Sequence, residues 1–233
     1  MNDQTAIILF SRTPKEEAKL KPLCKDYKSS VKVASIAMSQ ALNSALKSGL
    51  PVYVFTENEQ RGVNFGERIA NAIDDIFIKG YERVIAIGND CLSLGTREIL
   101  SAVQLLVSND CVLGEAEDGG VYLIGLHRLT FQKNTFQNIR WQTNLVLSDL
   151  INLIDAQSLT LKLLSKKPDL DRYSDWKHVL SSLELSLRKK LLTLISLVKY
   201  RPKIFNDLPI NFHFLIISPI LRAPPNKLLQ TFL

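Results

Sequence analysis

The sequence predicts an α/β fold with a mostly parallel sheet and a C-terminal helical tail. Short apolar runs typical of buried strands alternate with segments that have the apolar spacing of helices, and glycine or proline separates many of them. This alternation is typical of a parallel sheet that helices cover on both faces. A chain of 233 residues with 46% hydrophobic and 22% charged residues can bury one sizeable core, or one core with an appendage.

The first half of the chain alternates between strand and helix. Residues 6–10 form a short apolar run, as expected for a buried strand, whereas the lysine-rich stretch 12–32 contains Pro14 and Pro22 and is expected to be a loop. Gly49 and Gly80 follow the two periodic segments and end them. The predicted elements are strands at 6–10, 51–55 and 83–87 and helices at 33–47 and 65–78.

The second half continues the pattern as far as residue 175. Thr96 is a plausible N-cap for a helix. A glycine pair, Gly119 and Gly120, lies between two strands, and the final strand is expected at the edge of the sheet. The predicted elements are helices at 96–107 and 144–154, strands at 111–113, 121–126 and 159–164, and a loop at 167–175.

The C-terminal part differs in charge from the rest of the chain. Residues 177–233 hold nine Lys/Arg against two acids, which leaves twenty against twenty-one for the rest, although the whole chain has a net charge of +6. We therefore divide the chain into a domain at 1–178 and a basic tail at 179–233. Within the tail, residues 178–200 have one apolar helical face. The apolar stretch 208–221 is too short for a membrane-spanning helix, which needs about 20 residues.

The tail helix has three interpretations. It can pack across the sheet, lie on an anionic membrane, or contact a partner subunit in a homodimer. Packing is the default, because the apolar face is regular. The basic excess belongs to this tail and not to a patch interleaved with aromatics, which argues against nucleic-acid binding.

Compartment and metal preference follow from simple features. The N-terminus, MNDQTAIILF, lacks a basic n-region and a long apolar stretch, so a signal peptide is not expected and the cytoplasm is the expected location. Three widely spaced cysteines and three scattered histidines predict reduced thiols and no zinc site. Any metal is therefore expected to have oxygen ligands.

Two carboxylates stand at strand ends and are the leading candidates for chemistry. Asp90 follows an apolar strand, where a carboxylate can hold Mg²⁺ or Mn²⁺ against nucleotide phosphates. Asp118 directly precedes Gly119 and Gly120, which favour close backbone approach to a ligand. Taken singly, each aspartate is more simply explained as a turn or capping residue. Ligands of open parallel sheets bind beyond the carboxyl ends of the strands, where Asp90 lies.

Other candidates are weaker when taken one by one. Lys19 and Lys21 can neutralise phosphate, although a lysine run is usually a solvated surface. Loop aspartates are more often solvated turn residues than ligands. Trp141 and Thr143 most simply pack against or cap the next helix. The remaining candidates are Gly62, Gly66 and Arg68 for a nucleotide or base pocket, and Asp169, Asp171 and Asp175 in the late loop.

Several segments occur together in one order: ILFSRTP and AKLK (8–14 and 18–21), QRGVNFGERIANA (60–72), IAIGNDCLSL (85–94), VLGEAEDGGVYLIGL (112–126), FQNIRWQT (136–143) and DLDRYSD (169–175). In this order they resemble a bacterial glycosyltransferase-like family of the GT-A nucleotide-diphospho-sugar transferase superfamily, related to phospholactate guanylyltransferase. The resemblance spans about residues 5–178. It implies a Rossmann-like three-layer sandwich with a mostly parallel sheet.

The resemblance also implies roles for individual residues. Asp90 would hold Mg²⁺ or Mn²⁺, with Asp171 or Asp169 as a second contact, and Asp118, Gly119 and Gly120 would face the acceptor or sugar. The substrate-binding set would comprise Arg12, Lys19, Lys21, Gly62, Gly66, Arg68, Gly119, Gly120, Trp141 and Thr143. Catalysis in such folds is mainly positioning and charge neutralisation of a leaving phosphate or pyrophosphate.

The chain departs from the family pattern near the phosphate loop. Glu16, Glu17 and Ala18 stand where the family has a glycine before a Lys-Thr-Arg-Leu run, and Lys21 replaces the arginine. Leu92 and Glu115 replace expected prolines. Three hypotheses follow: sugar transfer from a nucleotide sugar to a small acceptor, nucleotidyl transfer from an NTP to a phosphorylated acceptor, or a degenerate member that binds nucleotide without turnover.

Overall fold

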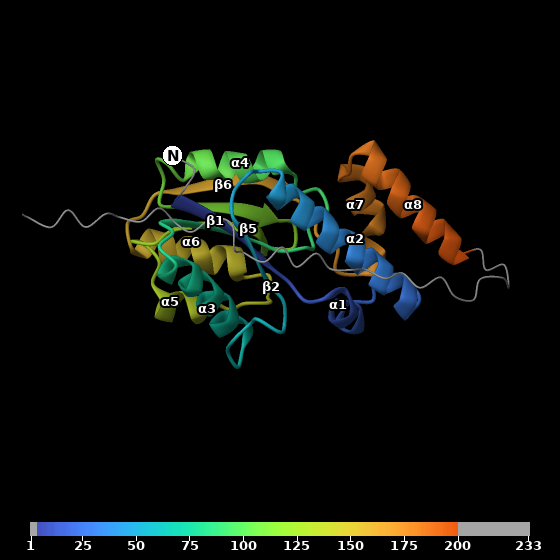
Figure 1. Cartoon of the computed structure of the whole chain (residues 1–233), viewed down its shortest axis with the longest axis horizontal. Helices are drawn as coiled ribbons and strands as arrows, with labels where there is room; N and C mark the ends of the chain where they lie inside the picture. Colours follow the sequence, from blue (N-terminus) through green and yellow to red (C-terminus); the bar gives the residue numbers. More distant parts are fainter. Residues whose placement is uncertain (1–3, 200–233) are drawn as a thin grey trace, which may run out of the picture.

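Six strands form one sheet between two layers of helices in the computed structural model, which describes residues 4–199 (Figure 1). The strand order is β2-β1-β3-β5-β4-β6. Every neighbouring pair is parallel except those that involve β5, which runs antiparallel to β3 and to β4. The predicted α/β fold with a mostly parallel sheet is therefore confirmed. The strands are β1 (Thr5–Phe10), β2 (Val52–Phe55), β3 (Arg83–Ile87), β4 (Cys111–Ala116), β5 (Val121–His127) and β6 (Leu161–Lys167).

The reversed direction of β5 decides where the turn before it lies. In the register of β3 with β5, Ile87 pairs with Leu123 and Arg83 pairs with His127. The start of β5 therefore lies at the sheet edge where β1 and β3 end. Residues 117–120 directly follow β4, which runs in the same direction as β3, and they therefore come to the same edge as Asp90.

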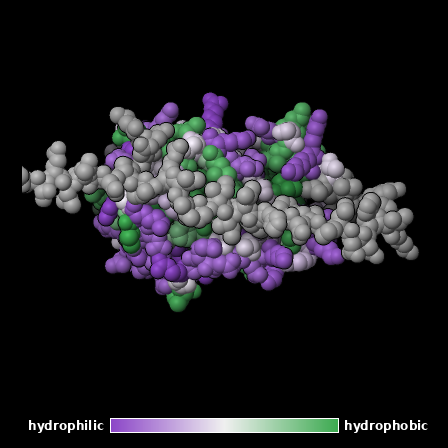
Figure 2. Space-filling model, in the orientation of Figure 1, coloured by the Kyte–Doolittle hydropathy of each residue, from purple (hydrophilic) through white to green (hydrophobic). Residues whose placement is uncertain are grey.

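Two apolar cores cover the faces of the sheet. Alternate strand residues point to opposite faces, so β1 directs Ile8 toward one core and Ile7 toward the other. The helices α3 (Phe65–Ile78), α5 (Lys133–Gln137) and α6 (Val146–Ala156) cover the first face, and α2 (Tyr27–Leu46) and α4 (Thr96–Leu105) cover the second. On the surface shown in Figure 2, hydrophilic side chains predominate where described residues are visible.

The segment predicted to be one long loop at 12–32 contains two helical pieces, which corrects that prediction. The helix α1 (Pro14–Leu20) begins with proline, whose fixed φ suits the first helical turn. Helix α2 begins at Tyr27, six residues before the predicted start, because the Asp26 side chain accepts a hydrogen bond from the Ser29 N–H and caps it. The cap of α4 is Gly95 and not Thr96, and the Glu98 side chain accepts the Gly95 N–H.

The tail helix predicted at 178–200 is two helices, α7 (Trp176–Ser182) and α8 (Leu185–Lys199), separated at Leu183 by extended backbone. Both join one apolar cluster with α2, in which Val179 and Leu191 are fully buried, and α8 contacts α2 directly, so the packing is on a helix and not across the sheet. The predicted domain boundary after residue 178 falls inside α7. Residues 200–233, which include the predicted apolar stretch at 208–221, lie outside the described residues. Within 4–199 no helix is long and apolar enough to cross a membrane.

We expect the three cysteines to resist alkylation in the native protein. Cys24, Cys91 and Cys111 are free and buried, and burial raises the pKa of the Cys24 thiol to about 11 and those of Cys91 and Cys111 to about 12. At pH 8 the thiolate fraction should fall at least about 100-fold below that of an exposed cysteine. Iodoacetamide labelling followed by mass spectrometry, with urea-unfolded protein as the control, checks this. Rapid labelling of folded protein would contradict it.

Candidate active site

A cavity of about 570 Å³ opens at the edge where β1 and β3 end and β5 begins. Three stretches of chain bring carboxylates to it: Asp90 follows β3, Asp118 precedes β5, and residues 169–171 follow β6. Ten of the residues singled out in the sequence line this cavity: Arg12, Lys21, Arg68, Asp90, Asp118, Gly120, Trp141, Thr143, Asp169 and Asp171. The topology of the sheet therefore gathers segments that are up to 159 residues apart in the sequence, from Arg12 to Asp171.

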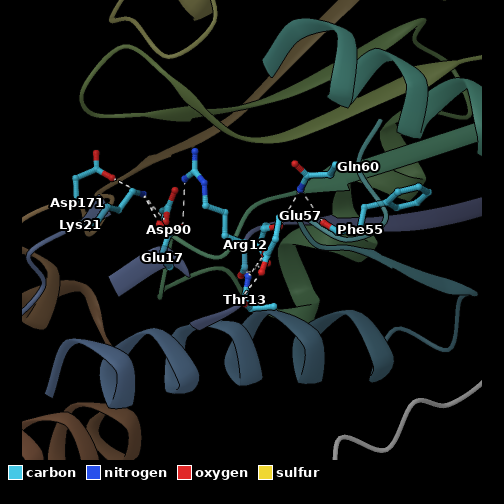
Figure 3. A network of polar contacts seen from close by, with 10 residues as sticks. Arg12, Thr13, Glu17, Lys21, Phe55, Glu57, Gln60, Asp90 and Asp171 are labelled. Atoms are coloured by element: carbon cyan, nitrogen blue, oxygen red, sulfur yellow. Dashed lines mark hydrogen bonds and ion pairs between the residues drawn. The ribbon is translucent and has the colours of Figure 1, made fainter. Parts of the chain in front are cut away.

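Lys21 lies at the centre of a cluster of carboxylates (Figure 3). Its Nζ is 2.7 Å from Asp90 Oδ1, 2.7 Å from Asp171 Oδ1 and 3.0 Å from Glu17 Oε1. Arg12 adds a second cation, with Nη1 3.4 Å from the other oxygen of Glu17. We refer to Glu17, Asp90 and Asp171 as the carboxylate cluster.

Glu17 is a site residue that sequence reasoning missed. Its side chain is nearly inaccessible, and it joins Arg12 to Lys21. The pair Glu17 and Lys21 has the i,i+4 spacing of a helix, which is a recognisable pattern. This pattern indicates a pair only within a helix, and residues 12–32 are predicted to be a loop.

Burial and neighbouring charges shift the pKa of three groups around the cavity, namely Asp90, Asp169 and Lys21. Burial, opposed by Lys21, raises the pKa of the Asp90 carboxyl, although 38% of its side-chain surface is accessible from the cavity. Burial and the charges of Asp90 and Asp118 raise the pKa of Asp169 to about 8. Although burial opposes it, the charges of the carboxylate cluster hold the pKa of Lys21 well above its ordinary value.

The oxygen-rich wall of the cavity fits Mg²⁺ or Mn²⁺ by its chemistry. Carboxylates are preferred ligands of both ions. Asp169 Oδ1 is buried and has no hydrogen-bond partner among the described residues, so one acceptor remains unsatisfied. Yet within residues 4–199 no three His, Cys, Asp or Glu side chains are grouped as a ready metal site. Lys21 lies between two of the three aspartates that were predicted to bind metal.

The chain after β6 is fixed to the loop that carries Lys21. The Leu170 N–H donates to Asp90 O at 3.1 Å, and the Tyr173 N–H donates to Pro22 O at 3.1 Å. The Trp176 indole N–H donates to Leu23 O at 2.7 Å. These bonds hold the late loop against the ends of β3 and α1, and they place Asp171 beside Lys21.

The glycine pair has a structural role that differs from the predicted ligand approach. Gly119 has φ of +91°, and a Cβ there would lie 2.3 Å from Asn144 O, so the close approach is to protein backbone. Gly66 is similar, since its Cβ would lie 2.0 Å from Gln137 O. Gly120 does line the cavity, and its N–H donates to Asp118 Oδ1 at 2.8 Å. That bond orients the Asp118 carboxylate.

Four predicted substrate-binding residues are not among those that line the cavity: Lys19, Gly62, Gly66 and Gly119. Lys19 is exposed and pairs with Glu16 at 2.6 Å. Gly62 has φ of +139° and packs against Glu67. Their predicted contact with substrate has no geometric support in this conformation and stays a prediction.

One wall of the cavity is aromatic. Phe65 packs edge-on against Phe10 with ring centroids 5.5 Å apart, and Trp141 packs against Phe65 at the same distance. The Trp141 indole N–H donates to Phe136 O at 3.1 Å, which fixes the ring. Arg68 stands beside this wall, and its Nε is buried without a hydrogen-bond partner among the described residues. The cavity thus combines a charged end with an aromatic end.

The fold and the cavity define a class: an α/β protein with an oxygen-rich site at the ends of its strands. Residues 27–143 match the family described as "Uncharacterized protein conserved in bacteria (DUF2064)", and the chain belongs to that family. Comparison with curated proteins finds no match.

One solved structure shares the fold, and others are similar at lower scores. A protein from Desulfovibrio desulfuricans G20, provisionally assigned as a nucleotide-diphospho-sugar transferase, is 21% identical, with a TM-score of 0.71 over 84% of this chain and 98% of that one. The 4-diphosphocytidyl-2C-methyl-D-erythritol synthase of Anaerococcus prevotii DSM 20548 is 6% identical, with a TM-score of 0.41 over 85% of this chain and 100% of that one. A manganese complex of Rv0371c from Mycobacterium tuberculosis H37Rv is 12% identical, with a TM-score of 0.43 over 77% of this chain and 100% of that one. At these scores the last two do not bear on the chemistry of this chain.

Proposed function

We propose that this chain is a nucleotide-utilising transferase that depends on Mg²⁺ or Mn²⁺ and moves a sugar from a nucleotide sugar to a small acceptor. The observation that carries the proposal is the gathering of four aspartates, Lys21 and Arg12 around one cavity at the ends of the strands. The likeness in fold to a provisionally assigned nucleotide-diphospho-sugar transferase supports it.

The residues of the cavity divide into two roles under this proposal. Arg12 and Lys21 would contact the phosphates, since ammonium and guanidinium groups form charge-assisted hydrogen bonds with phosphate oxygens. Asp118, which the Gly120 N–H orients, would face the acceptor and take the proton of its hydroxyl group. Trp141 and Phe65 would exclude water from the acceptor end.

Asp90, Asp169 and Asp171 would hold the divalent cation. When bound there, Mg²⁺ or Mn²⁺ neutralises the charge that develops on the leaving phosphate. The aspartates would come together only after Lys21 leaves the position between Asp90 and Asp171. The buried, unpaired Oδ1 of Asp169 offers a further ligand atom.

Thermal unfolding with a panel of nucleoside triphosphates, diphosphates and nucleotide sugars, each with and without Mn²⁺, tests the proposal. Ligand at about 100 times its Kd should stabilise the protein by roughly 2.7 kcal/mol. We expect a metal-dependent shift in the wild type that Asp90→Ala abolishes. Asp155→Ala, an exposed aspartate on α6, is the control and should keep the shift. No shift with any nucleotide would refute nucleotide binding.

The products then separate the alternatives. Release of nucleoside diphosphate from a nucleotide sugar indicates sugar transfer, whereas pyrophosphate from an NTP indicates nucleotidyl transfer. Nucleotide binding without turnover, even with Mn²⁺ supplied, indicates a degenerate member. The altered loop supports this third outcome, because three carboxylates hold Lys21, which is a predicted phosphate ligand. A homodimer through α8 and a cytoplasmic location stay predictions.

A further inference from the structure

Lys21 occupies the position that a divalent cation would need. Its Nζ contacts the same Oδ1 atoms of Asp90 and Asp171 that face each other across the cavity end. Only 20% of its side chain is exposed. The contacts come from three separate parts of the fold, namely α1, the end of β3 and the loop after β6. Tertiary structure therefore fixes the position of Lys21 Nζ, and the ion pair with Glu17 within α1 is only one of its contacts.

Two cations cannot share these oxygens at low cost. Carboxylate oxygens bind Mg²⁺ at about 2.0–2.1 Å, and each Oδ1 is 2.7 Å from Lys21 Nζ, so an ion bound to Asp90 and Asp171 would lie within about 5 Å of the present Nζ position. The dication and the ammonium would repel each other strongly at that separation, even with partial solvent screening. Binding of the metal therefore requires Lys21 to move out of the cluster.

Glu17 sets how Lys21 can move. Its Oε1 is 3.0 Å from Lys21 Nζ, and its Oε2 is 3.4 Å from Arg12 Nη1, with only 4% of the Glu17 side chain exposed. A lysine that leaves Asp90 and Asp171 can thus keep one carboxylate partner. The movement nevertheless breaks the ion pairs of Lys21 with Asp90 and Asp171. Binding of the metal must offset the free energy that is lost with them.

We infer that Lys21 is a built-in competitor of the divalent cation, an ammonium that neutralises the carboxylate cluster and suppresses metal binding in the nucleotide-free protein. This inference rests on the proposed function for the identity of the metal ligands. It assigns Lys21 a second role beside contact with phosphate. The role concerns metal affinity and can be measured without turnover.

Titration of the full chain with Mn²⁺ alone, followed by electron paramagnetic resonance of the free ion, tests the inference. We expect Lys21→Met to bind Mn²⁺ at least about tenfold more tightly than the wild type, because the competing charge is removed. Lys15→Met, which removes an exposed lysine from the same helix, should leave the affinity unchanged. Lys21→Arg keeps the charge and should bind Mn²⁺ as weakly as the wild type. Adding Asp90→Asn to Lys21→Met should remove the gain.

Equal or weaker Mn²⁺ binding by folded Lys21→Met would overturn the inference. Circular dichroism and thermal unfolding establish that the variant is folded. Should it not fold, Lys21→Gln carries the same expectation, because a neutral amide can still donate to the carboxylates. Tighter Mn²⁺ binding by the variant together with no nucleotide binding by the wild type would refute the proposed function alone. Nucleotide binding without any gain in the variant would refute the inference alone.

Discussion

Replacement of Gly119 by alanine should destabilise the protein by on the order of 3 kcal/mol in the absence of any ligand. Gly119 has φ of +91°, where a side chain is strained, and its Cβ would lie 2.3 Å from the backbone oxygen of Asn144. Backbone cannot rotate aside as a side chain can, so the 117–120 turn or the 142–144 segment must shift. Urea unfolding monitored by circular dichroism measures the loss.

Gly120→Ala is the matched control for this prediction. Gly120 is not in the left-handed region, and its Cβ would lie 3.0 Å from the Asp118 side-chain oxygen and 3.8 Å from the Ala116 Cβ, with no backbone atom as near. We expect its free energy of unfolding to stay within about 1 kcal/mol of the wild type. The reverse order, with Gly120→Ala the more destabilising, would contradict the packing role of Gly119. Equal stability with loss of ligand binding in Gly119→Ala would restore the interpretation of close approach to a ligand.

The central part of the fold could be predicted from the sequence because it is strongly patterned. The runs at 6–10 and 83–87 are buried along β1 and β3, and α3 has the predicted bounds. Apolar periodicity, together with glycines that end the segments, is enough to locate an element when one of its faces is apolar and the other is polar. Boundaries were less accurate at β4, which continues to Ala116, and at β6, which runs to Lys167.

Elements that depend on caps and charged residues were missed. The segment with α1 looks like a solvated loop because it is rich in lysine and glutamate, yet Pro14 begins a helix and Glu17 is buried by pairing with cations. The short α5 has no long apolar stripe of its own, and only Phe136 is buried. Tertiary contacts, which a sequence window does not contain, stabilise both.

The aspartates of the candidate site were identifiable one at a time, but their mutual geometry was not. Asp90 follows from its position at a strand end, whereas the arrival of Asp118 at the same edge depends on the way in which β4 and the antiparallel β5 are placed beside β3. The sequence also gave no indication that Lys21 lies between Asp90 and Asp171. That contact needs α1 to turn its last residues toward β3, which is a tertiary property.

Residues after β6 complete the site, and they lie before the predicted domain boundary at residue 178. Leu170 and Trp176 are buried with Val33 of α2, and the Trp176 indole N–H reaches Leu23 O. Asp171 lies between these two anchors. The packing of α7 on α2 thus positions a predicted metal ligand, and stability and site geometry are linked here.

Replacement of Trp176 by alanine should cost about 3–5 kcal/mol, the range observed for large aromatic residues removed from a core. Only 6% of Trp176 is exposed, and the change also leaves Leu23 O without its donor. Urea unfolding measures the free energy of unfolding. If its dependence on urea concentration is the same in both proteins, a lower midpoint concentration shows that the variant is less stable. Because the loop that carries Asp171 loses its anchor, any nucleotide-dependent thermal shift should weaken as well.

Trp176→Phe separates packing from hydrogen bonding. Phenylalanine keeps most of the buried aromatic surface and loses the indole N–H, so we expect a smaller cost of about 1–3 kcal/mol for the unpaired carbonyl of Leu23. An intact nucleotide-dependent shift in this variant would show that packing alone holds the loop. A cost below about 1 kcal/mol for Trp176→Ala itself would mean that α7 does not pack on α2 in solution. In that case the position of Asp171 beside Lys21 would lose its structural support. The segment 171–176 carries both the Asp171 contact with Lys21 and the Trp176 hydrogen bond to Leu23 O.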